Sequence, residues 1–190
     1  MNTATHMLVA SAALARRGAP ARNSLALAGA LLPDLSIFTL YFWGRLIDGQ
    51  SSAQIWRITY WSEPWQTFSA VSNSIPLWAS ISLIGLATRS GWIAVLGMAG
   101  LLHVLLDFPV HNDDAHRHFW PLSDWRFISP LSYWDNDHHG REVAIAEMAF
   151  GAILIGVLGW RFTAVWARTF LALAFLSYAA VPIYFWATLG

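Results

Sequence analysis

One pair of side chains in this sequence has the spacing of two metal ligands on one helical face. His103 and Asp107 are four residues apart in an apolar stretch, so in a helix they lie one turn apart on the same side. An imidazole nitrogen and a carboxylate oxygen in that arrangement can bind one divalent ion. His138 and Glu142 repeat the spacing, with His139 beside them. The sequence therefore predicts a metal centre to which both pairs contribute.

The segment that joins the two pairs is the part of the chain richest in metal-ligand side chains. Residues 101–142 hold six of the seven histidines and seven of the eleven carboxylates, although only 12% of all residues are charged. Among them are the candidate ligands His111, His116 and His118. This composition favours a metal site or an acid/base site. One alternative is a single helix histidine that pairs with its neighbouring carboxylate. The other is a pH-sensitive surface loop.

The composition of the whole chain indicates an all-α integral membrane protein. Of its 190 residues 56% are hydrophobic, and 12 are Trp and 11 Phe, which is far from the soluble average. The net charge is zero and there is no Lys. Because the sequence shows no basic patch, we do not predict a nucleic-acid partner. There is also no Cys, so a metal would need nitrogen and oxygen ligands, which suit zinc, manganese, iron or magnesium.

The apolar stretches predict about five to six helices in a single domain, residues 1–190. We expect a short N-terminal helix over 3–15, an interfacial His/Asp-rich loop over 109–141, and membrane spans over about 24–43, 69–88, 92–108, 143–160 and 169–186. Asp34 follows Pro33 inside the first span. A carboxylate is costly at that depth, so we expect Asp34 to face protein, water or metal.

Charge in the loops predicts how the protein lies in the membrane. The short loops at 16–23, 89–91 and 161–168 hold six Arg and no acid, whereas the long connections hold nearly all of the acids. The positive-inside rule places the Arg-only side in the cytoplasm. We therefore expect a multi-pass protein of the bacterial inner membrane with the His/Asp-rich loop on the periplasmic side.

Four short motifs resemble a known family. They are TH at 5–6, LLPD at 31–34, HVLLD at 103–107 and FWPL at 119–122. In this order they resemble the LexA-binding, inner-membrane-associated family of metal-dependent hydrolases. They are distantly similar to the zinc-dependent phospholipase C and single-strand nuclease superfamily, whose HxxxD and HxxxE pairs hold zinc. The resemblance covers about two thirds of the chain as scattered motifs, and it implies that His6 and Asp34 are further ligands.

The sequence departs from that family at one motif. The family carries HRGxTHS after LPD, whereas this chain has no histidine between His6 and His103. In the corresponding region Glu63 is the only titratable ligand. Either Glu63 replaces the missing imidazoles, or one metal position is lost together with the activity.

The leading hypothesis is a membrane-embedded hydrolase that uses one or two zinc-like ions to activate water against a phosphoester or phospholipid-type substrate. Its predicted catalytic residues are Asp107, Glu142 and Glu63. Its predicted metal ligands are His6, Asp34, His103, Asp107, His111, His116, His118, His138, His139 and Glu142. The alternatives are a non-catalytic membrane binding or assembly protein whose His-rich loop docks a partner, and a transporter with Asp34 as its intramembrane ion site.

Overall fold

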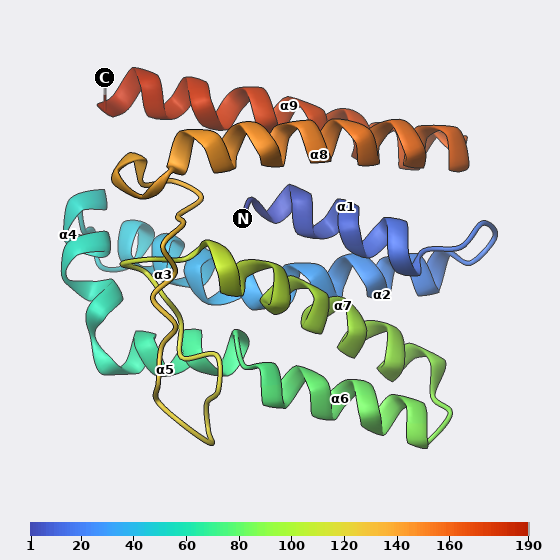
Figure 1. The fold of residues 1–190 in the computed structure, drawn as a ribbon, viewed down its shortest axis with the longest axis horizontal. Coiled ribbons are helices and arrows are strands. Elements are labelled where there is room, and N and C mark those ends of the chain that lie inside the picture. Colours follow the sequence, from blue (N-terminus) through green and yellow to red (C-terminus); the bar gives the residue numbers. More distant parts are fainter. Residues whose placement is uncertain (190) are drawn as a thin grey trace.

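The computed structural model of the chain describes residues 1–189, with side chains through residue 178 and at residue 180, and within that range it is helical without a strand (Figure 1). The helices are α1 (Thr3–Leu14), α2 (Pro20–Leu31), α3 (Leu35–Leu46), α4 (Ser52–Arg57), α5 (Glu63–Ser72), α6 (Ile75–Ala87), α7 (Gly91–Asp107), α8 (Gly140–Arg161) and α9 (Val165–Leu189). Short 3-10 turns join several of them: η1 (Leu32–Asp34), η2 (Thr59–Trp61), η3 (Phe108–Val110) and η4 (Asn136–His138). The predicted all-α architecture is confirmed.

Four helical stretches are long and apolar enough to cross a membrane. They are Pro20–Leu46, Glu63–Ala87, Gly91–Val110 and Gly140–Arg161, with mean hydropathies between 1.4 and 2.0. Helix α1 is apolar but too short to span, as predicted. The fifth predicted span, 169–186, falls within α9, where the side chains of residue 179 and of the residues from 181 onward lie outside the described part.

Proline determines helix boundaries that differ from the prediction. The first spanning stretch begins at Pro20 rather than near residue 24, because proline fits the first turn of a helix, where its missing N–H is not needed. The second begins at Glu63 rather than residue 69, followed by Pro64 in its first turn. It is interrupted at Asn73 and Ser74, and the Ser74 hydroxyl accepts the Leu77 N–H.

Helix α7 packs between α6 and α2, and α2 also packs against α1. Small residues allow this close approach. A Cβ on Gly29 of α2 would lie 2.4 Å from the Leu96 carbonyl oxygen of α7, and one on Gly97 would lie 2.6 Å from the Ser82 nitrogen of α6. Such small-residue contacts are typical of helix pairs in membranes. They fix α7, which carries His103, directly against α2.

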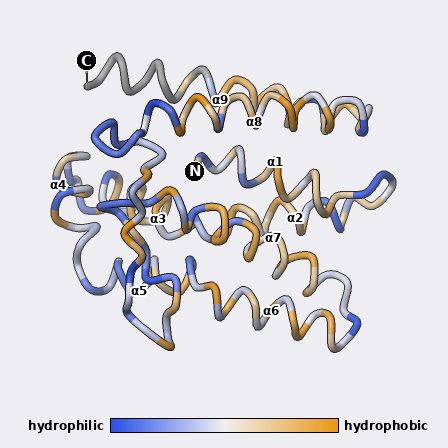
Figure 2. Tube along the Cα trace, in the orientation of Figure 1, coloured by the Kyte–Doolittle hydropathy of each residue, from blue (hydrophilic) through white to orange (hydrophobic). Residues whose placement is uncertain are grey.

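The helical hairpins α1–α2, α6–α7 and α8–α9 all turn at the same end of the molecule (Figure 1). Figure 2 shows polar segments gathered at the two ends and apolar residues along the helices between them. At the hairpin end Arg161 donates to the carbonyl oxygens of Ala12 and Ala15, and Arg22 donates to that of Leu14. Three of the Arg-bearing loops therefore share one end, and the connections rich in acids lie at the other.

Candidate metal centre

Helices α1 and α7 bring His6, His103 and Asp107 together where α1 begins and α7 ends. One ligand atom of each lies within 4.8 Å of the others, and all three residues are buried. His6 Nε2 is 3.0 Å from Asp107 Oδ1, and His103 Nε2 is 3.0 Å from Asp107 Oδ2. Each carboxylate oxygen of Asp107 thus faces one imidazole nitrogen. Part of the predicted ligand set forms a cluster that could hold a metal ion.

The protonation of His103 can be assigned from its second ring nitrogen. His103 Nδ1 lies 2.6 Å from the carbonyl oxygen of Ala30 on α2, which can only accept a hydrogen bond. In the neutral imidazole Nδ1 therefore carries the proton and Nε2 presents its lone pair. Within the described structure Nε2 is buried and makes no hydrogen bond, although Asp107 lies 3.0 Å away.

Two acceptor atoms that face each other at this distance are bridged either by a proton or by a metal cation. Zinc binds nitrogen and oxygen at about 2.0–2.1 Å, so two tetrahedral ligands lie roughly 3.3 Å apart. The 3.0 Å separation of His103 Nε2 and Asp107 Oδ2 is close to that value. A backbone carbonyl on the distal nitrogen is also the usual outer partner of a metal-bound histidine. The geometry of this pair fits a divalent ion.

The rings of His6 and His103 stack with centroids 3.6 Å apart and an angle of 12° between their planes. The stacked arrangement points both Nε2 atoms at the carboxylate of Asp107. His6 Nδ1 is buried without a hydrogen-bond partner in the described structure. Burying two positive imidazolium rings in contact would be costly, so the stack favours at least one neutral ring, the form that binds metal.

Asp34 lies at the edge of this cluster, where η1 turns away from α2. Its Oδ1 is 3.6 Å from His103 Nε2, and its Oδ2 accepts a hydrogen bond from the Thr3 hydroxyl at 2.5 Å. The Met1 amino group donates to Asp107 Oδ1 at 2.5 Å. Asp34 therefore faces protein, as expected, and adds a second carboxylate to the imidazole of His103.

A second group of imidazoles adjoins the first through His111. His111 Nε2 lies 3.6 Å from Asp107 Oδ1, and its Nδ1 lies 3.0 Å from Asp114 Oδ2. The His116 ring is 4.8 Å from that of His111, and the His118 ring is 5.6 Å from that of His116. All three imidazoles are buried. The predicted histidines 111, 116 and 118 thus form a chain of rings that begins beside Asp107.

The loop that carries these rings is held against the helices by hydrogen bonds. The Ile75 N–H donates to the His118 carbonyl oxygen, and the Ser129 N–H donates to that of His111. Ser69 of α5 lies with its hydroxyl 3.0 Å from His116 Nδ1. Phe108 stacks on Phe127 with centroids 4.8 Å apart. The loop lacks regular secondary structure, yet these contacts fix its imidazoles in place.

Burial and neighbouring charges set the protonation of these loop residues. Burial lowers the pKa of His118 to about 4 and that of His116 well below its ordinary value. Both rings are therefore neutral at pH 7 and able to bind a metal. Burial also opposes the charged form of His111, but Asp107 and Asp114 outweigh it and raise its pKa to about 9. Asp114 is a site residue that we did not predict as a ligand. Its position three residues after His111 is the sequence feature that could have indicated it.

The structure does not bring four of the predicted residues into this cluster. His138 lies in η4 and contacts Asp135 at 2.7 Å. His139 is exposed and precedes α8 in a left-handed conformation with φ 63°, and Glu142 is exposed in the first turn of α8. Glu63 bonds Thr67 and Arg117 with its side chain 76% exposed. Glu63 therefore does not stand in for the missing family imidazoles.

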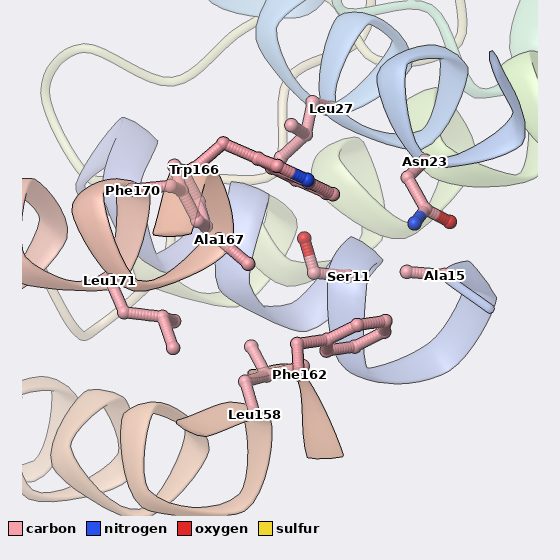
Figure 3. Close-up of a pocket in the computed structure, with 10 residues that line it drawn as sticks. All are labelled: Ser11, Ala15, Asn23, Leu27, Leu158, Phe162, Trp166, Ala167, Phe170 and Leu171. Atoms are coloured by element: carbon pink, nitrogen blue, oxygen red, sulfur yellow. The ribbon is translucent and has the colours of Figure 1, made fainter. Parts of the chain in front are cut away.

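An apolar pocket lies at the far end of α1, between that helix, α2, α8 and α9 (Figure 3). Leu158 and Phe170 face Ser11 across it, with Asn23 at its edge. Its lining contains no His, Asp or Glu. This pocket is thus chemically unlike the cluster around Asp107, and it offers no ligands for a metal.

The cluster is the only group of three or more His, Asp or Glu residues among the described residues whose ligand atoms converge this closely. Comparison with protein-family models, with curated proteins and with solved structures finds no match to this chain.

Proposed function

We propose that the protein is a membrane-embedded, metal-dependent hydrolase. The observation that carries the proposal is the position of the buried His103 Nε2, which lies 3.0 Å from Asp107 Oδ2 while the other ring nitrogen contacts the Ala30 carbonyl oxygen. A donor set of imidazoles and carboxylates without Cys suits zinc. A bound divalent ion lowers the pKa of a coordinated water toward neutrality and stabilises charge on a phosphoryl oxygen.

In this proposal His6, His103 and Asp107 hold the first ion, and Asp34 lies beside it as a further carboxylate. A second ion would need further ligands, and His111 Nε2 lies 3.6 Å from Oδ1, the oxygen that also faces His6. His116 and His118 are buried close to that position. If a second ion were bound, Asp107 would be the carboxylate shared by the two sets of ligands, and the pair of ions would supply stabilisation of the attacking and leaving oxygens of a phosphoester.

The proposed substrate is a phosphoester of the phospholipid type. Asp107 lies at the C-terminal end of helix α7 in the spanning stretch Gly91–Val110, and the adjoining loop exposes the apolar side chains of Leu122, Trp125 and Trp134. Tryptophan at such an end is typical of the membrane interface. A site at that depth would meet lipid headgroups, which carry phosphodiester bonds.

The proposal is tested by hydrolysis assays on protein purified in detergent and supplied with zinc. A chromogenic phosphodiester and mixed phospholipid micelles serve as substrates. We expect turnover by the wild type and a loss of at least about 100-fold in Asp107→Asn, because the bridging carboxylate would be gone. Asp124→Asn, which alters an exposed carboxylate paired with Arg117, is the matched control. Equal rates in all three proteins would refute the proposal.

A non-catalytic membrane protein that docks a partner is the second candidate. It is favoured by the same exposed apolar side chains, since Leu122 is 80% and Trp125 55% exposed. This candidate predicts that zinc binds and that neither ester is hydrolysed at any zinc concentration. The assays above therefore distinguish the two functions.

A further inference from the structure

Glu147 is a buried acid in the N-terminal half of the apolar helix α8, and the metal cluster does not include it. It is 4% exposed. Its Oε1 accepts hydrogen bonds from the Asn2 N–H at 2.6 Å and from the Thr5 hydroxyl at 2.5 Å. Its Oε2 is buried without a partner in the described structure. A carboxyl group is expensive inside a membrane span and is usually retained for a function.

The groups that Glu147 binds belong to the first turn of α1. The first N–H groups of a helix have no partner within the helix and need acceptors. Asn2 at the N-cap makes no side-chain capping bond, and the first turn of α1 contains no acid. Glu147 supplies from α8 the negative group that a helix N-terminus favours. It thereby joins the start of α1 to a helix more than 140 residues later in the sequence.

The opposite side of the same turn faces the metal cluster. Thr3 donates to Asp34, and His6 Nε2 lies 3.0 Å from Asp107. Asn2 and Thr5 both donate hydrogen bonds to Glu147 of α8. The other side of the turn contacts the carboxylates of Asp34 and Asp107. A shift of this turn would move His6 away from Asp107.

Tyr178 of α9 completes the support behind this turn. Its hydroxyl lies 2.6 Å from the Thr5 hydroxyl. Because Thr5 has a single proton, which it donates to Glu147, Tyr178 must donate to Thr5. Gly151 of α8 gives the tyrosine room, since a Cβ there would lie 2.3 Å from the Tyr178 hydroxyl. The hydrogen bonds thus run from Tyr178 through Thr5 to Glu147.

We propose that Glu147 is a positioning residue of the metal centre: it fixes the first turn of α1 so that His6 Nε2 is held against Asp107. The inference rests on the proposed function, because it assigns Glu147 a task in metal binding. Glu147 acts through Asn2 and Thr5 and does not itself contact the ion. Outer residues of this kind typically contribute 10- to 100-fold to metal affinity.

The test compares zinc affinities, measured by competition with a chelating dye, for wild type, Glu147→Ala and Glu147→Gln in detergent. A glutamine side-chain oxygen can accept both hydrogen bonds, so Glu147→Gln should bind zinc nearly as tightly as wild type. Glu147→Ala should lose about 10- to 100-fold. In a His6→Ala background it should cause no further loss. Glu63→Ala, at an exposed acid, is the control.

Hydrogen exchange over residues 2–8 of the metal-free proteins separates this inference from the proposed function. We expect faster exchange there in Glu147→Ala than in Glu147→Gln. Zinc affinity in Glu147→Ala equal to wild type would overturn the inference, and so would a full additional loss in the His6→Ala background. If the wild type bound no zinc, the proposed function would fail. If exchange over residues 2–8 were also unchanged in Glu147→Ala, the positioning role of Glu147 would fail as well.

Discussion

His103 on α7 is joined to Ala30 on α2 by a 2.6 Å hydrogen bond from Nδ1 to the carbonyl oxygen. This bond directs the free Nε2 toward Asp107. The orientation of a ligand therefore depends on how closely two membrane-spanning helices pack. The consequence can be tested without changing any ligand.

Gly29→Ala should disturb the metal centre, because Gly29 precedes Ala30, whose carbonyl oxygen contacts His103. The new Cβ would lie 2.4 Å from the backbone carbonyl oxygen of Leu96, so α2 must move away from α7 and carry Ala30 with it. Overpacking of this kind costs about 1–3 kcal/mol, and we expect weaker zinc binding with it. Gly156→Ala, where no atom lies within 4 Å of the added carbon, is the control. Thermal unfolding and zinc titration of both variants check the prediction, and equal behaviour would argue against it.

Ser69→Ala should destabilise the protein through His116. The serine hydroxyl lies 3.0 Å from the buried His116 Nδ1, and removing it leaves that nitrogen without its partner. An unsatisfied buried polar group costs about 1–3 kcal/mol. Ser72→Ala on the same helix removes only hydroxyl bonds to the backbone carbonyl oxygens of Phe68 and Ser69. Thermal unfolding in detergent should show a clear decrease in midpoint for the first variant and little change for the second.

Alkaline stability should depend on Tyr60, a buried residue of η2. Burial raises the pKa of its hydroxyl well above the ordinary value of 10. Above pH 10 the unfolded chain loses this proton and the folded chain keeps it, so stability is complete below pH 10 and declines as pH rises further. Tyr60→Phe should flatten that decline. Denaturant midpoints measured from pH 8 to 11.5 check this, and parallel curves for the two proteins would contradict it.

Removing metal should destabilise the folded protein. An ion that binds only the native state adds about 2.7 kcal/mol when its concentration is 100 times the dissociation constant. The thermal midpoint should therefore rise with added zinc and fall with a chelator. In Asp107→Asn, which lacks the carboxylate shared by His6 and His103, the midpoint should not respond to zinc.

The sequence predicted the part of the cluster that lies on regular helices. His103 and Asp107 share a helix face because both fall inside one uninterrupted helix. Asp34 and His6 could be found because a ligand-type residue in an apolar stretch is costly unless it has a partner. The short first helix follows equally from the length of its apolar segment, whereas the structure has more helices than the five to six predicted, because the long connections and the spans are broken into shorter ones.

The spacing of His138 and Glu142 predicted a shared helical face that the structure does not have. The four-residue rule holds only within one helix, whereas His138 lies in η4 and α8 begins at Gly140. His139 between them has a left-handed backbone that turns the chain. The loop histidines join the cluster through long-range hydrogen bonds that no local pattern encodes. Glu147 could be noticed in the sequence as a lone acid in an apolar span. Its partners could not be predicted, because they lie at the N-terminus, far away in sequence.

Metal stoichiometry is the most direct test of the centre. Zinc bound per chain is measured by elemental analysis after equilibration and gel filtration, for wild type, His103→Gln and the exposed control His139→Gln. We predict at least one zinc per chain in wild type and in His139→Gln, and a loss of about one zinc in His103→Gln. A wild-type protein without bound zinc, or His103→Gln with the full wild-type content, would contradict the assignment of a metal centre around Asp107.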